Sequence, residues 1–322
     1  MSEFALIDRF FKRAPRDAAV RLGIGDDAAL IVPSGGMELA VSVDMLVEGR
    51  HFLPGTDPAR LGHKTLAVNL SDMAAMGATP RWALLAGALP GDDADWVAAF
   101  MSGFDTLATA YDVELIGGDT TRGPRNLSVT IIGEVAAGTA LRRSGARVGD
   151  DIYVSGTLGD AAAALAALTS RTRLDPEAMK VLRARLEAPT PRVALGNALR
   201  GVATSCIDIS DGLVGDLGHI LEASAVGARI ALDAIPRHPA LAAKLRGAER
   251  AQALEFLLAG GDDYELCFTA PRAAGGRIEA IARELALPIT RIGGIHAAPG
   301  LVVDDERGKP LATLPHAFDH FA

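Results

Sequence analysis

Short apolar segments of strand length recur along this chain, and several end in a group of glycine, serine and aspartate residues. Residues 113–116 are followed by Gly117-Gly118-Asp119, and residues 202–209 by Ser210-Asp211-Gly212. Segments with helical periodicity, such as 58–77 and 93–111, lie between the strands. Because the period changes repeatedly from two to 3.6, the chain is expected to mix α and β structure.

The order of the predicted elements narrows the fold class. An amphipathic helix is expected first, and strands at 28–32 and 39–46 are expected to form a hairpin around Pro33-Ser34-Gly35-Gly36. A final helix and a second hairpin are expected to close the chain. Hairpins mixed with crossovers favour an α+β fold, with mixed sheets covered by helices on one side, over a parallel doubly wound sheet.

Two domains fit the length of 322 residues. After the loop at 137–150 the pattern restarts with a strand at 152–155 and a glycine-containing turn. We therefore expect one domain over residues 1–138 and a second over residues 139–322.

Composition excludes several classes of function. The chain has 40 acidic and 32 basic residues, a formal charge of −8 and only 5% aromatic residues, which argues against nucleic acid and membrane-surface partners. It contains no apolar run of membrane-spanning length and no secretory signal pattern, so a cytoplasmic protein is expected. Cys206 and Cys267 lie in apolar strand-like runs and are expected to be buried thiols.

Gly23-Ile24-Gly25-Asp26-Asp27-Ala28 fits the dinucleotide-binding pattern, but the segment after it has strand character. That pattern needs a helix whose N-terminal amides hold the pyrophosphate, and two carboxylates would repel a bare pyrophosphate. The carboxylates become favourable when Mg²⁺ stands between them and a phosphate.

The candidate magnesium ligands are carboxylates at strand ends: Asp26, Asp27, Asp44, Asp72, Asp119, Asp208 and Asp211. Any one of them has an ordinary alternative as a turn former or helix N-cap. Asp44 and Asp208 are the exceptions, because each interrupts an apolar strand, where a carboxylate needs a cation or several donors. Ser42 and Ser210 lie beside them with hydroxyl oxygens.

The sequence contains no Walker loop, so phosphates need other donors. The backbone N–H groups of Gly117-Gly118 and Gly260-Gly261 are candidates, and tight turns are the alternative. Arg143 can clamp a phosphate or lie on the surface, and His51, after Asp44, can bind a ligand or be structural.

An ordered set of motifs is similar to one enzyme family. The set resembles the thiamine-monophosphate kinase family in Gly23-Ile-Gly-Asp-Asp-Ala28, Ser42-Val-Asp44, Asn69-Leu-Ser-Asp72, Ile116-Gly-Gly-Asp-Thr-Thr-Arg-Gly123, Arg143-Ser-Gly145, Ile207-Asp-Ile-Ser-Asp-Gly212, Gly260-Gly-Asp-Asp-Tyr-Glu-Leu266 and Phe318-Asp-His-Phe321. The resemblance spans nearly the whole chain.

The resemblance implies a two-domain α+β fold like that of aminoimidazole ribonucleotide synthetase. It implies ATP-dependent phosphorylation of thiamine monophosphate to thiamine diphosphate, a step of thiamine diphosphate biosynthesis. Residues 1–138 then form the domain for ATP, Mg²⁺ and dimerisation, and residues 139–322 the α+β domain that completes the active site. A homodimer is implied, with ATP as co-substrate and several Mg²⁺ ions.

The site residues carried over from the family fall into three groups. The implied metal ligands are Asp27, Ser42, Val43 through its carbonyl, Asp44, Asp72, Asp119, Asp208 and Asp211. The implied ATP contacts are Gly118, Asp119, Arg143 and Ser210, and the implied thiamine monophosphate contacts are His51, Asp262 and Phe318. The family usually has Glu where Asp262 stands and often Thr where Val43 stands.

The implied chemistry assigns no side chain as a catalytic acid, base or nucleophile. The acceptor phosphate is largely ionised at neutral pH, so transfer is expected to be direct, in line and without a phosphoenzyme. A metal-dependent phosphohydrolase and a non-catalytic nucleotide sensor are the alternatives. The related selenide-activating enzymes typically carry a reactive cysteine or selenocysteine near the N-terminus, and the first cysteine here is Cys206.

Overall fold

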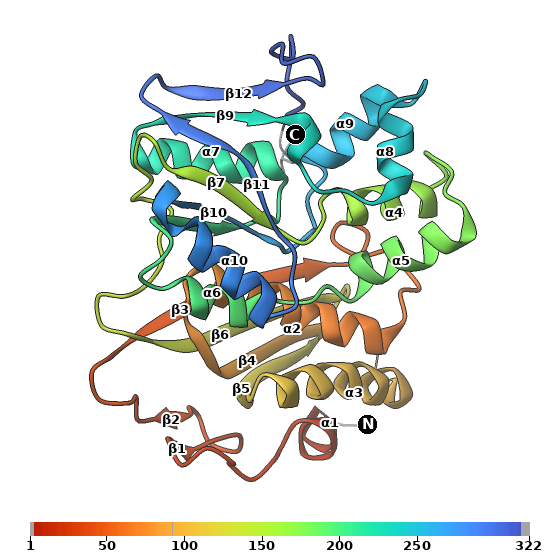
Figure 1. The fold of residues 1–322 in the computed structure, drawn as a ribbon. Coiled ribbons are helices and arrows are strands. Elements are labelled where there is room, and N and C mark those ends of the chain that lie inside the picture. The colour runs from red at the N-terminus through yellow and green to blue at the C-terminus, as the bar shows by residue number, and fades with distance from the viewer. Residues whose placement is uncertain (1–2, 92, 317–322) are drawn as a thin grey trace. The chain divides into compact units, whose positions relative to one another are not determined.

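The computed structural model describes residues 3–91 and 93–316 (Figure 1). The chain divides into two compact units. The first comprises Met1–Met73, Ala78–Ala140 and Glu187–Pro189, and the second comprises Ala74–Gly77, Leu141–Leu186 and Thr190–Ala322.

The first part of the chain forms three helices and six strands among the described residues. They are α1 (Glu3–Phe10), β1 (Val20–Leu22), β2 (Leu30–Ile31), β3 (Met37–Val47), α2 (Pro58–Ala75), β4 (Thr79–Leu89), α3 (Ala94–Ala110), β5 (Glu114–Arg122) and β6 (Asn126–Ala136).

The rest of the described chain forms a second set. Its α-helices and strands are β7 (Asp151–Ser155), α4 (Asp160–Leu168), α5 (Pro176–Glu187), α6 (Val193–Leu199), β8 (Ser205–Asp208), α7 (Leu213–Ser224), β9 (Gly227–Ala231), α8 (Pro239–Leu245), α9 (Arg250–Ala259), β10 (Leu266–Ala270), α10 (Gly275–Glu284), β11 (Ile289–His296) and β12 (Gly300–Asp304). Short 3₁₀ turns lie at Leu232–Ala234 and Arg272–Ala274.

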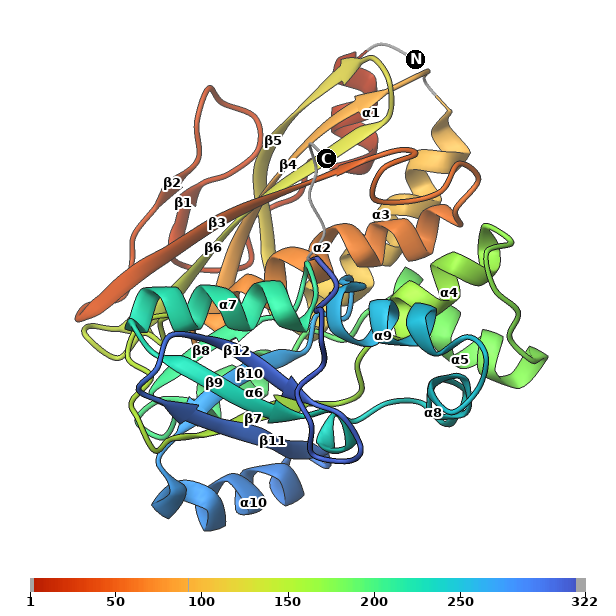
Figure 2. The same ribbon diagram turned by 90° about the horizontal axis from the view of Figure 1, so that it is seen from above.

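The first unit is built on a four-stranded sheet of order β3-β6-β4-β5, in which only the β4–β5 pair is parallel. Helices α2 and α3 cover one face of it (Figure 2). The two helices approach closely at glycines, because a Cβ at Gly62 would lie 1.9 Å from the carbonyl oxygen of Phe100 and a Cβ at Gly103 would lie 1.8 Å from that of Ala59.

Strands β1 and β2 form a small separate sheet over the other face of the first unit. Val20 and Ile31 pack there with Trp82 of β4 and Ile116 of β5. The predicted hairpin of β2 with β3 is therefore wrong. Strand β3 pairs with β6 along its whole length, and Glu134 of β6 accepts hydrogen bonds from the backbone N–H and the hydroxyl of Ser34 at 2.6 and 3.0 Å. The loop is thus held to β6.

The second unit contains a six-stranded sheet of order β12-β9-β11-β7-β10-β8. Helix α7 packs on one face and α10 on the other (Figure 2), so helices cover both faces of this sheet and not one as expected. The predicted terminal hairpin is also wrong, because β9 lies between β11 and β12 and pairs parallel to β12.

Both cysteines are buried and free, as predicted. Burial in the apolar core raises the pKa of each thiol, which makes the reactive thiolate form scarce. Among the described residues, none of the helices combines the length and the apolar character that crossing a membrane requires.

Candidate active site

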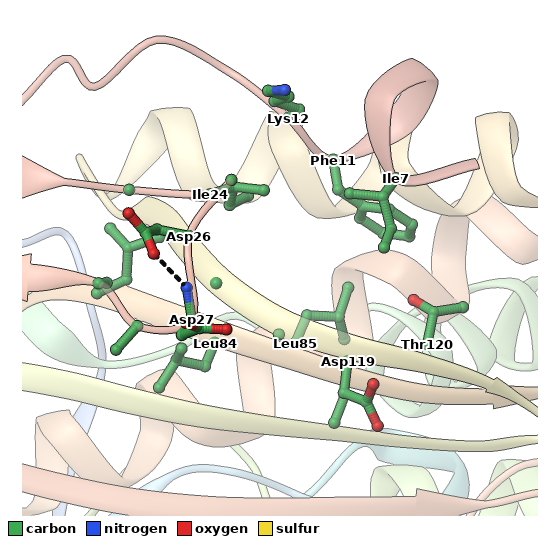
Figure 3. A pocket seen from close by; sticks show the side chains of 18 of the residues that line it. Ile7, Phe11, Lys12, Ile24, Asp26, Asp27, Leu84, Leu85, Asp119 and Thr120 are labelled. Atoms are coloured by element: carbon green, nitrogen blue, oxygen red, sulfur yellow. Dashed lines mark hydrogen bonds between the residues drawn. The ribbon is translucent and has the colours of Figure 1, made fainter. Parts of the chain in front are cut away.

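A pocket of about 780 Å³ lies in the first unit (Figure 3). Helix α1, the loop after β1, and strands β4, β5 and β6 line it. Of the predicted site residues, Asp27, Gly118 and Asp119 are among its lining residues. The sequence signals at 23–28 and 117–119 therefore meet in space, although they lie far apart in the chain.

Glycines shape the floor of this pocket. Gly118 has φ 155°, and a Cβ there would lie 1.9 Å from the carbonyl oxygen of Leu85 on β4. A Cβ at Gly117 would lie 2.7 Å from the side chain of Leu84. The β4–β5 register is shifted at this point, between Ala83 and Leu84. Only glycine permits so close an approach, which leaves backbone of β5 exposed to the pocket.

The charged side chains of the pocket are mainly acidic. Asp8, Asp26, Asp27 and Asp119 line it together with Lys12. Lys12 Nζ lies 3.2 Å from Asp8 Oδ1, and the carboxylate of Asp26 accepts a hydrogen bond from the backbone N–H of Asp27 at 2.8 Å. A polyphosphate alone would be repelled here, whereas hard oxygen ligands of this kind suit Mg²⁺ carrying a phosphate.

A second group of predicted ligands lies where β3 meets α2. The hydroxyl of Ser42 donates a hydrogen bond to Asp72 Oδ2 at 2.6 Å, and the backbone N–H of Asp44 donates to Asn69 Oδ1 at 3.1 Å. Ser42 and Asp44 are two residues apart on one strand, so both side chains face α2. The structure thus brings Ser42 and Asp72 into direct contact.

Val43 points the other way. It pairs with Thr130 of β6, which lines the pocket, and its side chain is 59% exposed. Within residues 3–91 and 93–316, no three His, Cys, Asp or Glu side chains are grouped closely enough to hold a metal ion by themselves. The predicted ligands of the first unit therefore form two groups, one on each face of its sheet.

His51 follows β3 in a tight loop. Its ring Nδ1 accepts a hydrogen bond from the backbone N–H of Val47 at 3.0 Å, and the backbone N–H of His51 donates to the carbonyl of Val47 at 2.9 Å. An Nδ1 that accepts carries no proton, so the proton of the neutral ring is on Nε2. His51 therefore presents an Nε2–H donor.

In the second unit the predicted residue Asp208 is the last residue of β8, and Ser210 and Asp211 lie between β8 and α7. Asp216, on the first turn of α7, accepts hydrogen bonds at 3.1 Å from the backbone N–H groups of Ser210, Asp211 and Gly212. Burial, and then the charges of Asp208 and Asp211, raise the pKa of Asp216 to about 8. Three carboxylates are thus crowded at one helix start, a setting that a cation would stabilise.

Sequence reasoning missed Asp216. Its signal was available, since an acidic residue in the first turn of a helix that follows Ser-Asp-Gly caps the free N–H groups. Gly212 has φ 108°, and a Cβ there would lie 2.6 Å from the backbone of Ala259.

Asp262 lies in the loop before β10. Its backbone N–H donates to the carbonyl of Ser210 at 2.8 Å, and the Tyr264 hydroxyl donates to Asp262 Oδ1 at 2.9 Å. Next to it, Asp263 is buried and its Oδ2 accepts from the N–H of Gly159 at 2.8 Å. Burial raises the pKa of Asp263 well above its ordinary value.

Glu265 anchors the same loop and was not singled out from the sequence. It is completely buried and accepts hydrogen bonds from Arg185, from Arg192 Nε at 2.7 Å and from Ser155 Oγ at 2.5 Å. Two cations and a hydroxyl around one carboxylate hold the start of β10 in place.

Arg143 is exposed, in a loop whose backbone is held from α7. Ser224 Oγ donates to the Arg143 carbonyl at 3.3 Å and accepts from the N–H groups of Gly145 and Ala146 at 3.1 Å. The backbone that carries the Arg143 guanidinium is thus held in place. Phe318 lies outside the described residues.

Comparison with known proteins identifies the family. The AIR synthase related proteins match with their N-terminal domain over residues 25–135 and with their C-terminal domain over residues 147–306. Thiamine-monophosphate kinase of Salmonella typhimurium (strain LT2) is 47% identical over 322 residues, which cover 99% of this chain and 98% of the relative.

Solved structures agree. The crystal structure of thiamine-monophosphate kinase from Stenotrophomonas maltophilia K279a is 48% identical with a TM-score of 0.87, covering 97% of this chain and 98% of that one. AaThiL complexed with AMPPCP and TMP is 32% identical with a TM-score of 0.78, covering 90% and 89%. The chain belongs to the thiamine-monophosphate kinase family within the AIR synthase related proteins.

Proposed function

We propose that this chain transfers the γ-phosphoryl group of ATP to thiamine monophosphate and forms thiamine diphosphate, as a step of thiamine diphosphate biosynthesis. The observation that carries the proposal is the 47% identity with a thiamine-monophosphate kinase over 99% of the chain. The relative solved with AMPPCP and TMP supports both substrates, and the pocket of about 780 Å³ is large enough for a nucleotide.

The proposed ATP contacts are Gly118, Asp119, Arg143 and Ser210. Gly118 presents backbone at the pocket floor, and apolar side chains of Ile7, Phe11 and Ile24 line the same pocket (Figure 3). Apolar walls with a few polar groups suit a base at one end and phosphates at the other.

Mg²⁺ is the proposed metal, held by Asp27, Ser42, Val43 through its carbonyl, Asp44, Asp72, Asp119, Asp208 and Asp211. The donor set supports this, since it consists of carboxylate, hydroxyl and carbonyl oxygens. The crowding of Asp208, Asp211 and Asp216 at the start of α7 supports an added positive charge in the second unit. When bound, Mg²⁺ would supply charge neutralisation for the phosphates.

The residues of the chain then act by position. The acceptor is already an ionised phosphate, so no side chain has to remove a proton from it before attack. His51 would donate its Nε2–H to the acceptor, and Asp262 would accept from the exocyclic amino group of the aminopyrimidine. Phe318 would offer an aromatic face to the thiazolium ring. Transfer is direct and leaves no phosphorylated side chain.

A homodimer through the first unit is also proposed. Strand β3 is an edge strand, and one side of it carries Met37, Leu39, Val41, Val43 and Met45, all between 43% and 61% exposed. An exposed apolar edge strand favours pairing with a second copy. The domain roles given above, with nucleotide and dimerisation in residues 1–138, and the cytoplasmic location stay predictions from the sequence.

The direct test is a chromatographic assay of the purified chain with Mg²⁺, ATP and thiamine monophosphate. We expect equal amounts of ADP and thiamine diphosphate. Controls contain free thiamine or no acceptor. Inorganic phosphate released without an acceptor would indicate the phosphohydrolase instead, and tight ATP binding without turnover the nucleotide sensor.

A further inference from the structure

The loop that carries Asp262 is held in an unusual backbone conformation. Asp262 has φ 63° and Tyr264 has φ 50°, and neither is glycine. Side chains make this left-handed region unfavourable, so two such residues in one short loop persist only when the surroundings impose them.

The surroundings that impose it are hydrogen bonds with Ile209 and Ser210, which directly follow β8. The N–H of Asp262 donates to the Ser210 carbonyl at 2.8 Å, and the N–H of Tyr264 donates to the Ile209 carbonyl at 2.9 Å. In return, the N–H of Ile209 donates to the carbonyl of Glu265 at 2.8 Å. The backbone at Asp262 is therefore fixed relative to the Ser210-Asp211 segment.

The side chain of Asp262 is held by a different contact. Tyr264 is 8% exposed, and its hydroxyl donates to Asp262 Oδ1 at 2.9 Å. The ring of Tyr264 is confined by its burial, so the hydroxyl is a fixed donor. A carboxylate has about four lone-pair sites, so accepting from Tyr264 sets its rotation while leaving capacity for a ligand donor.

We propose that Tyr264 is the positioning residue for the acceptor, and that its hydroxyl orients the Asp262 carboxylate toward the exocyclic amino group of the aminopyrimidine. This rests on the proposed function. Tyr264 then sets specificity for an amino substituent without touching the substrate, because a carboxylate held in one rotation favours a donor at one place.

The test compares two acceptors, thiamine monophosphate and its analogue in which oxygen replaces the exocyclic amino group. Tyr264→Phe removes only the hydroxyl. We expect it to raise KM for thiamine monophosphate by about five- to tenfold, the usual effect of one lost hydrogen bond, with kcat and KM for ATP within about twofold. Discrimination between the two acceptors should fall by the same factor.

If Tyr264 has a purely structural role, Tyr264→Phe should raise KM equally for both acceptors. That result would overturn the proposal. In an Asp262→Ala background, Tyr264→Phe should have no further effect, and a full second loss of affinity would also overturn it.

Tyr153 provides the matched control. It is also buried in the second unit, where its ring stacks on Phe268 with 5.3 Å between centroids. Tyr153→Phe should leave acceptor discrimination unchanged. A wild-type chain that phosphorylates neither acceptor would overturn the proposed function, and the positioning role with it. A wild-type chain that is active, with an unchanged KM in Tyr264→Phe, would overturn the positioning role alone.

Discussion

Ser42 on strand β3 donates its hydroxyl hydrogen to the carboxylate of Asp72 on helix α2 across 2.6 Å. The bond joins an edge strand to the helix that covers it, and both oxygens are proposed metal ligands. A strand–helix contact thus orients both proposed ligands, as in sites whose ligands are oriented by neighbouring hydrogen bonds.

Replacing a proposed ligand by its amide should disable the enzyme. We expect Asp44→Asn, Asp72→Asn and Asp208→Asn each to lower turnover by at least about 100-fold and to raise the Mg²⁺ concentration needed, because an amide binds Mg²⁺ weakly. Initial rates over a Mg²⁺ titration measure both. Asp304→Asn is the control, since Asp304 pairs with Arg229 Nε at 2.6 Å on the surface and should not matter. Equal losses in all four variants would refute the metal assignment.

Gly118→Ala should abolish nucleotide binding or fold poorly. The added Cβ would lie 1.9 Å from the Leu85 carbonyl oxygen, so β4 and β5 must separate at the pocket floor. Binding of an ATP analogue by calorimetry and thermal unfolding report the two effects. The contrasting variant is Gly218→Ala within α7, where a Cβ meets nothing within 4 Å. It should stabilise the chain by about 0.5–1 kcal/mol. Similar behaviour of the two variants would contradict the geometric argument.

Asp160 should make stability fall as pH rises. Burial, opposed by the Thr157 hydroxyl and by Arg185, raises the pKa of its carboxyl in the folded chain. Between the ordinary carboxyl pKa and the raised value, the folded chain binds more protons than the unfolded chain, so its stability decreases with rising pH. In Asp160→Asn the contribution of this carboxyl to the pH dependence of the unfolding free energy should be lost. Urea unfolding between about pH 4 and 8 measures that dependence.

The opposite sign is expected at Asp305. Backbone N–H groups of Lys309 and Arg307 lower the pKa of its exposed carboxyl. Its contribution to the stability of the folded chain is therefore lost as pH falls below the ordinary carboxyl range. Asp305→Asn should therefore matter least in acid. If the free energy of unfolding of Asp160→Asn depends on pH as it does in the wild-type chain, the Asp160 carboxyl titrates normally.

Glu265→Gln should lower the unfolding free energy of the second unit. The substitution leaves the guanidinium groups of Arg185 and Arg192, 21% and 14% exposed, without their anion. Removing one member of a buried ionic group costs about 3–5 kcal/mol. Glu306→Gln, which breaks a surface pair with Arg250, should cost about 0–1 kcal/mol. Urea unfolding distinguishes the two, and equal costs would mean that Glu265 is not anionic in the folded chain.

Val41→Glu should shift a dimer toward monomer. Val41 is 61% exposed at the middle of the apolar side of β3, and a carboxylate at a paired surface would be buried without a cation. Sedimentation velocity measures the change in mass. Val181→Glu, on the exposed side of α5, is the control and should leave the mass unchanged. A monomeric wild-type chain would refute the proposed dimer.

Local signals predicted the elements well. The helix at 93–111 is α3, and Asp93 caps it by accepting from the N–H of Trp96 at 3.0 Å. Pairing was harder, because periodicity shows which face of a strand is buried and not which strand lies beside it. Both hairpin predictions failed for that reason, since β3 pairs with β6 and β12 with β9.

The candidate site was partly predictable. Carboxylates and glycines that were expected to follow strand ends indicated the pocket residues Asp27, Gly118 and Asp119, because these residue types suit only a few environments. The structure instead places Gly118 and Asp119 within β5, which continues to Arg122. Asp216 and Tyr264 were not singled out. Asp216 caps the backbone directly before its own helix, so its signal was local and was missed. Tyr264 acts on Asp262 two residues away, and that contact depends on left-handed backbone at both residues, which periodicity does not show.

The position of β12 at the sheet edge affects how the second unit folds during synthesis. Strand β9 is synthesised long before both of its partners, because β11 precedes β12 directly in the chain. Until residues 300–304 have left the ribosome, one edge of β9 remains open to other strands. A nascent chain of this kind depends on late, long-range docking, which folds slowly and leaves time for chaperones or for misassembly.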